Sequence, residues 1–287
     1  MPDRGVHPSS LQRANFSCFK TSDCNPAAIR TGRSLNRLIL LLLMVGIIEA
    51  CAQPFEPETE MVLIPAGPFT LGLDPANEIP SFISDRTASK NAQPQQEINI
   101  KAFYMDIDEV SYGKFLRFKP PAQYAEGRLT YPMQGISWFE ADAYCLWLGK
   151  RLPTEFEWEK AARGLEGNLY VWGNDFKREN ANFGKTIKSP AKQLEDLSEF
   201  GIYDLNGNVS EWTASWYQPY PGSSFVDPNF GKKYKVIRGG AINKREHGFL
   251  KEFALLPYRN FAPPKMRSWD TGFRCARSSP SSEKSNS

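Results

Sequence analysis

The sequence has little net charge, few histidines and no apolar run long enough to span a bilayer. A formal charge of +3 over 287 residues is too small for a nucleic-acid-binding face, and the basic residues form no stripe with interleaved aromatic residues. We therefore expect no nucleic-acid partner. The composition, 41% hydrophobic and 13% aromatic, is that of a chain with a folded core and not of a disordered one.

The longest apolar run covers residues 38–48, which is shorter than the roughly 20 residues of a membrane-spanning helix, and it follows several arginines. It predicts an export signal. Residues 50–52 (ACA) fit a peptidase site of the A-x-A type, whereas residues 48–51 (IEAC) resemble a lipobox. We favour the lipobox because a cysteine directly follows the apolar run, although Glu49 is unusual at its position. We expect Cys51 to carry a lipid.

The predicted domain covers residues 61–277, in which we find no repeat and no internal boundary. Residues 1–51 form an N-terminal extension with the export signal, and residues 52–60 form a tether rich in proline and glutamate. Residues 278–287 are a serine-rich tail that is too polar to fold. The lipid would attach this domain to a membrane of a bacterial cell envelope, in the periplasm or at the outer membrane.

Few segments of this domain predict regular secondary structure. Residues 61–72 alternate like a pair of strands pinched at residues 65–67, and residues 98–110 again have strand character. Residues 74–96 are polar and contain several prolines, which indicates a long surface loop. From residue 165 onward the sequence is rich in glycine, asparagine, aspartate and aromatic residues, so we expect turns and short strands.

Two S/T-x-x-E capping boxes predict helix starts, the first at Ser137 with Glu140 and the second at Thr154 with Glu157. A glycine follows each helix as a stop signal. Residues 111–118 predict another short helix. The apolar face that we expect the first capped helix to bury consists of Trp138, Ala141, Cys145 and Leu148.

In the second capped helix the acidic residues Glu155, Glu157 and Glu159 lie in the N-terminal half, where the helix dipole favours anions. Trp158 and Ala162 supply its apolar stripe. Core packing and capping therefore account for every residue of this segment.

Removal of the export segment leaves two cysteines, Cys145 and Cys275. An even pair in an oxidising compartment predicts a disulfide, which closes a long loop and stabilises the fold by about 4 kcal/mol. The alternative is a pair of buried free thiols.

A series of motifs occurs in a fixed order along the domain. They are MVLIPAGPFTLG, FYMDIDEVSYGKF, GISWFEADAYCLWLGKRLPTEFEWEKAARG, YVWGN, GIYDLNGNVSEWT, VIRGG and TGFRCAR. Together they resemble the formylglycine-generating enzyme family, also called sulfatase-modifying factors, over essentially all of residues 61–277. The resemblance implies a single α+β domain of the C-type-lectin-like kind with little regular secondary structure. It also implies that Cys145 and Cys275 form the structural disulfide of the family.

Family members that generate formylglycine hold copper through two cysteines placed shortly after the RGG motif, and they use a serine nearby. In this sequence Lys244 and Phe249 stand at the two cysteine positions and Ala241 stands at the serine position. Cu(I) prefers soft thiolate ligands, so we expect no copper and no formylglycine-generating activity. The iron-dependent branch of the family uses a histidine cluster, which His7 and His247 alone cannot supply.

The resemblance also implies a calcium site in the DLNGNVSE segment. Its ligands would be the side chains of Asp204 and Glu211 and the carbonyl groups of Gly207 and Val209, since calcium prefers oxygen ligands. The alternative is a tight Asn-Gly turn without metal. Residues 182–183 match the opening of a second calcium site, but the sequence that follows departs from the family pattern.

We therefore expect a non-catalytic, lipid-anchored envelope protein that binds a protein or peptide partner. The alternative is a periplasmic maturation enzyme, an oxidoreductase or an accessory to siderophore or nitrite-reductase maturation, that works through other residues. The candidate groups for that enzyme are Lys244, Arg245, Glu246 and His247, which also fit a solvated charged run.

Overall fold

A computed structural model describes residues 60–74, 87–120, 127–182, 192, 195–241 and 254–280. Internal contacts divide the chain into two compact units, Met1–Pro54 and Phe55–Ser287, and every described residue belongs to the second. The predicted export signal and Cys51 lie outside the described residues. Within them, the helices are all too short or too polar to cross a membrane.

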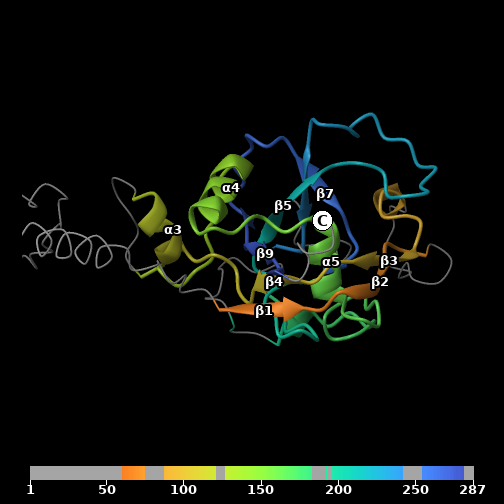
Figure 1. Cartoon of the computed structure of the whole chain (residues 1–287), viewed down its shortest axis with the longest axis horizontal. Coiled ribbons are helices and arrows are strands. Elements are labelled where there is room, and N and C mark those ends of the chain that lie inside the picture. The colour runs from red at the N-terminus through yellow and green to blue at the C-terminus, as the bar shows by residue number, and fades with distance from the viewer. Residues whose placement is uncertain are drawn as a thin grey trace, which may run out of the picture. The chain divides into compact units, whose positions relative to one another are not determined.

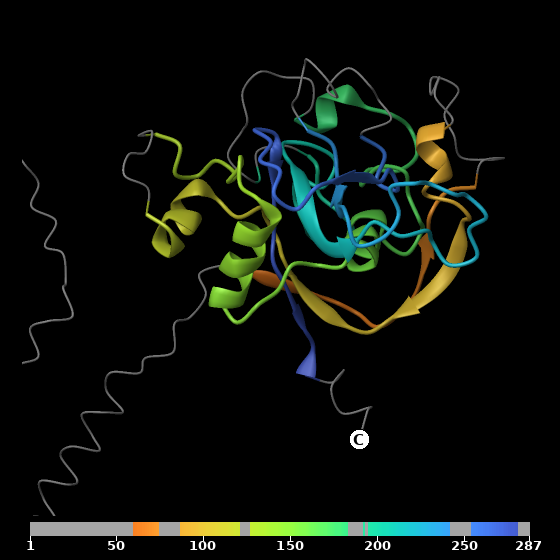
Figure 2. The ribbon, with the colours of Figure 1, turned by 90° about the horizontal axis from the view of Figure 1, so that it is seen from above.

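The strands form small separate sheets (Figures 1 and 2). The first sheet has the order β1 (Met61–Ile64), β4 (Phe103–Asp106) and β9 (Ala276–Ser278), and the second pairs β2 (Gly67–Leu71) with β3 (Gln96–Ile100). The third has the order β7 (Asn260–Ala262), β6 (Lys235–Arg238), β5 (Ser210–Trp216) and β8 (Thr271–Gly272). The expected α+β class with sparse regular structure is confirmed.

The expectation that residues 61–72 form a strand pair is wrong, although both strands exist. β1 pairs with β4, and β2 pairs with β3. A two-residue hairpin needs a positive φ within its turn, but neither Pro65 nor Ala66 has one, and Gly67, with φ of 131°, already belongs to β2. The chain therefore continues from one sheet into the next.

The capped helices form as predicted. α4 (Trp138–Trp147) and α5 (Glu155–Arg163) each begin with a complete capping box, in which the hydroxyl accepts the third backbone N–H and the glutamate accepts the cap N–H. α3 (Tyr112–Phe118) confirms the third predicted helix. The structure adds α2 (Thr87–Lys90), inside the segment expected to be a loop, and a 3₁₀ turn, η2 (Arg178–Asn180).

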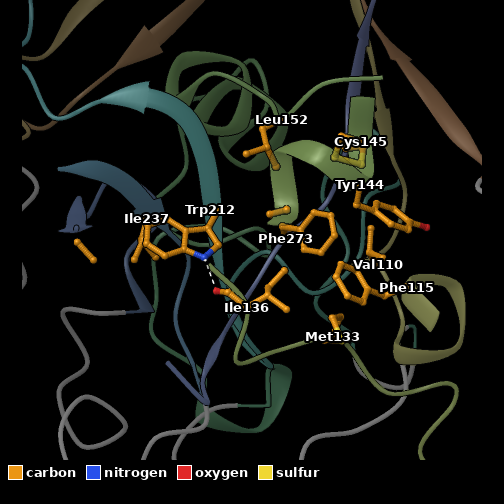
Figure 3. Packing of buried hydrophobic residues seen from close by; sticks show 13 residues of the cluster. Val110, Phe115, Met133, Ile136, Tyr144, Cys145, Leu152, Trp212, Ile237 and Phe273 are labelled. Atoms are coloured by element: carbon orange, nitrogen blue, oxygen red, sulfur yellow. Dashed lines mark hydrogen bonds between the residues drawn. A yellow bond between two sulfur atoms is a disulfide. The ribbon is translucent and has the colours of Figure 1, made fainter. Parts of the chain in front are cut away.

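One hydrophobic cluster joins α3, α4, β5 and the segment before β9 (Figure 3). Tyr144 stacks on Phe115 with ring centroids 5.6 Å apart and meets Phe273 edge-on at 5.4 Å. The indole of Trp212 donates to the carbonyl of Ile136 at 3.2 Å. The predicted helix face is partly right: Ala141 and Cys145 are buried, while Trp138 and Leu148 pack half-buried against the cluster.

The disulfide between Cys145 and Cys275 lies in this cluster and is confirmed. Its Cα atoms are 5.6 Å apart, and it joins α4 to the segment that enters β9 across a sequence separation of 130. The two sulfur atoms are bonded to each other, so the alternative of two buried free thiols is wrong.

The double substitution Cys145→Ala and Cys275→Ala should lower the free energy of unfolding by about 4 kcal/mol, because the unfolded chain regains the entropy of the open loop. Urea unfolding of the two proteins measures the difference. Peptide mapping of unreduced protein after alkylation is the control, and alkylation of both positions would contradict the bridge.

Candidate functional site

The resemblance places the copper site of the family in the loop that follows β6. A buried arginine holds the two ends of that loop, which form its base. Arg238, the last residue of β6, donates through Nη2 to Glu159 Oε2 at 2.6 Å and to the carbonyl of Leu256 at 2.8 Å. Residues 242–253, which lie outside the described residues, connect these two places in the chain. One guanidinium therefore fixes the beginning and the return of this loop.

Glu159, on α5, is the acceptor at the centre of this base. Its carboxylate accepts from the Gly72 N–H at 2.7 Å, the Tyr220 hydroxyl at 2.8 Å and Arg163 Nη1 at 3.1 Å, besides Arg238. Burial acts to raise its pKa, but Arg238 and Arg163 outweigh burial and hold the pKa below its usual value. Glu159 therefore stays ionised inside the core, where a charge is tolerated only when it is paired.

The RGG motif requires a glycine at Gly239, where φ is +78° and a Cβ would lie 2.9 Å from the carbonyl of Leu205 and 3.2 Å from the ring of Trp158. The hydroxyl of Ser210 donates to the carbonyl of Gly239 at 3.0 Å. The motif therefore packs tightly over α5.

Ala241, two residues further on, is 4% exposed and carries a methyl group where the family has a serine hydroxyl. The other residues predicted for this loop, Lys244, Arg245, Glu246, His247 and Phe249, lie outside the described residues.

The DLNGNVSE loop wraps around two buried carboxylates that come from distant segments. Glu109 accepts from the backbone N–H of Val209 at 3.1 Å and from the amide side chain of Asn208 at 2.7 Å. Asp196 accepts from the backbone N–H of Asn206 at 3.0 and 2.8 Å. Because these contacts fix the loop backbone, its shape does not depend on the Asn-Gly turn alone.

Glu211 ends this loop in an ion pair with Arg274. Arg274 Nε lies 3.0 and 2.8 Å from the two carboxylate oxygens, and its Nη2 lies 2.7 Å from Oε1. The indole of Trp158 donates to the same carboxylate at 2.9 Å. Asp204 has φ of 59° and accepts from the backbone N–H of Lys192 at 3.1 Å. Burial raises the pKa of Asp204 to about 6.

The loop holds more buried acid than base. Burial, and next the Asp204 carboxylate, raise the pKa values of Glu109 and Asp196 well above their usual range. Arg274 is the guanidinium that faces these groups and Glu211. A bound cation would favour the ionised form of these crowded carboxyl groups and lower their pKa values, so the loop fits calcium in charge.

The predicted calcium ligands are only partly available. Asp204 and the carbonyl groups of Gly207 and Val209 would hold the ion, whereas Glu211 would share its oxygens with Arg274. In the described part of the chain, His, Cys, Asp and Glu side chains nowhere gather in threes in a metal-binding arrangement. The predicted set contains only two such side chains, so calcium binding stays a prediction.

Asn182, which matches the opening of a second calcium site in the family pattern, contacts the DLNGNVSE loop. Its carbonyl accepts from the N–H of Asn208 at 2.8 Å, and its side chain donates to Asn208 Oδ1 at 3.0 Å. Phe183 lies outside the described residues.

Sequence reasoning assigned Glu155 and Glu159 to the helix dipole and overlooked Glu109 and Asp196. Glu155 and Glu159 are buried, and Glu155 forms an ion pair with Arg259 at 2.8 Å. The i, i+4 spacing of the two glutamates beside Trp158 was the available signal, because it places them on one face of the helix.

Calcium in excess over chelator should stabilise the folded protein and raise its melting temperature. At a free calcium concentration one hundred times the dissociation constant, the free energy of unfolding should rise by about 2.7 kcal/mol. The variant Asp204→Asn should lose this shift. Differential scanning calorimetry measures it, and Glu97→Gln, which changes an exposed carboxylate of β3, is the matched control. Equal melting temperatures in calcium and in chelator would contradict the site.

Comparison with known proteins gives agreeing results for sequence and fold. The family described as "Sulfatase-modifying factor enzyme 1-like domain" matches residues 49–279. The "Inactive C-alpha-formylglycine-generating enzyme 2" of Mus musculus is 39% identical over 165 residues, which are 53% of this chain and 50% of the relative. The protein of the same name from Bos taurus is 34% identical over 212 residues, 68% of this chain and 64% of the relative. The chain thus spans about half to two thirds of these relatives.

Among solved structures, PvdO from Pseudomonas aeruginosa superimposes with a TM-score of 0.60 at 24% sequence identity. The match covers 78% of this chain and 96% of that one. At this identity the likeness supports the fold alone.

Proposed function

The chain belongs to the sulfatase-modifying factor family, and we propose that it is an exported, lipid-anchored member without copper-cysteine oxidase activity that binds a protein or peptide at the cell envelope. The observation that carries the proposal is the use of its cysteines. Cys145 and Cys275 are joined in the core, and the sequence has no cysteine between them. The loop after the RGG motif therefore lacks the thiolates that Cu(I) prefers.

The intact base of that loop supports a binding role. Arg238, Glu159 and Gly239 keep the loop ends in place although the residues used for oxidation are replaced. A rigid base that carries a variable loop is a common basis for recognition. The similarity to relatives named inactive formylglycine-generating enzymes agrees with this proposal.

Export and lipid attachment rest on the sequence, through the apolar run at residues 38–48 and the cysteine that follows it. The alternative of a maturation enzyme rests on Lys244 to His247, which lie outside the described residues. No observation on the described residues favours that alternative.

The purified protein should bind cuprous ion weakly and should leave a cysteine-containing sulfatase peptide unchanged, because the loop offers no thiol. Competition with a colorimetric Cu(I) chelator and mass spectrometry of the peptide measure the two properties. The variant Lys244→Cys with Phe249→Cys is the matched control, since it returns two thiols and should bind cuprous ion more tightly. Conversion of the peptide to an aldehyde by the unmodified protein would refute the proposal.

Cells fed a labelled fatty acid should incorporate the label into this protein, and Cys51→Ala should abolish incorporation and release the protein from the membrane fraction. Ala52→Ser is the control, because it preserves the cysteine next to the apolar run. An unlabelled protein in the soluble periplasmic fraction would instead favour cleavage at residues 50–52. Affinity purification from membranes then tests for a reproducible protein partner.

A further inference from the structure

β3 is the outer strand of the two-stranded sheet (Figure 2). α5 contacts the opposite edge of that sheet, along β2: Arg163 Nη1 donates to the carbonyl of Thr70 at 3.3 Å and to that of Gly72 at 2.5 Å. Glu97 and Asn99 of β3 are exposed. A helix therefore contacts one edge of this sheet, whereas no strand in the described part of the chain pairs with the other.

The register shows which backbone groups of β3 point outward. Pro68 lies opposite Asn99 and has no N–H, so these two residues cannot form a hydrogen-bonded pair. The carbonyl of Thr70, opposite Glu97, is used by Arg163 and so points away from β3. In an antiparallel pair the bonded positions alternate. The N–H and C=O groups of Glu97 and Asn99 therefore line the outer edge.

A cavity of 510 Å³ lies at the N-terminal end of this edge. Its walls are the segment that leads into β3 and the loop after β5, and the side chain of Gln96 joins them by donating to the carbonyl of Pro221 at 2.8 Å. The cavity lining includes the charged side chains of Asp74 and Lys90, the amide side chains of Gln93 and Gln95, and the ring of Phe225.

A chain that pairs with β3 and continues past Gln96 reaches this cavity, because residues 93–95 line it. Edge pairing supplies main-chain hydrogen bonds, and an adjacent pocket selects a side chain; together these are the requirements for recognition of an extended peptide. The exposed side chain of Glu97 stands on one face of the sheet and favours a basic residue at the opposite position of the added strand.

We propose that an extended peptide segment of a protein partner adds as a strand to the outer edge of β3, with a basic residue opposite Glu97 and a polar side chain in the cavity. This inference rests on the proposed binding function and names the place and the mode of binding. The partner would be a protein with an exposed, extended segment that carries a basic residue at the position opposite Glu97.

The test selects ligands from a phage library of random nonapeptides on the full-length protein in detergent micelles. Asn99→Pro removes the outward N–H and leaves the β2–β3 hydrogen bonds in place, while Asn99→Ala removes only the side chain. We expect a selected peptide to bind about 10-fold more weakly to Asn99→Pro, through loss of one hydrogen bond and a steric clash, and nearly unchanged to Asn99→Ala. Both variants should melt at the temperature of the unmodified protein.

Hydrogen exchange supplies the second measurement, in which the bound peptide should protect the amides of residues 96–100. Peptides that bind Asn99→Pro and Asn99→Ala equally would overturn the edge site and leave the binding function standing. The edge site is also overturned, and the binding function also stands, if no peptide is enriched while affinity purification from membranes recovers a partner. If neither experiment yields a ligand, both proposals fail.

Discussion

The ion pair between Glu159 and Arg238 is the interaction on which the described structure most depends. It joins α5 to β6 in a fully buried place, and Arg163 joins the same carboxylate from the next turn of α5. A buried charge without its partner costs several kcal/mol, so neither residue tolerates the loss of the other. The pair thereby holds the helix, the strand and the return of the chain at Leu256 in one arrangement.

Buried arginines replace part of the hydrogen bonding that longer strands would provide. Arg274 pairs with Glu211 and also donates to the carbonyl of Tyr203 at 2.8 Å. Arg259 pairs with Glu155 and donates to the carbonyl of Gln218 at 2.8 Å. A guanidinium has five donors, so it can neutralise a carboxylate and satisfy irregular backbone at once. A fold with short strands and many turns needs such donors, because buried carbonyl groups are costly when unpaired.

This construction separates the framework from the chemistry that it carries. Arg238, Glu159 and Gly239 hold the base of the loop by contacts that involve neither a thiol nor a metal. The framework therefore stays intact although other residues stand at the positions of the family's copper-binding cysteines and serine. Family membership accordingly establishes the fold, whereas activity depends on a few loop residues.

The sequence alone determined the local elements. The hydroxyl and carboxylate of each capping box act within one helical turn, so α4 and α5 begin where the motifs predicted. The even pair of cysteines and the family motifs likewise predicted the disulfide and the fold class.

Only the tertiary structure decided which partners meet across the chain. It paired β1 with β4 and not with β2, and it brought Glu109 and Asp196 under the DLNGNVSE loop. It also made Glu159, which the sequence assigned only to the helix dipole, a buried acceptor. Strand pairing and burial depend on residues far apart in sequence, and a short motif carries no record of them.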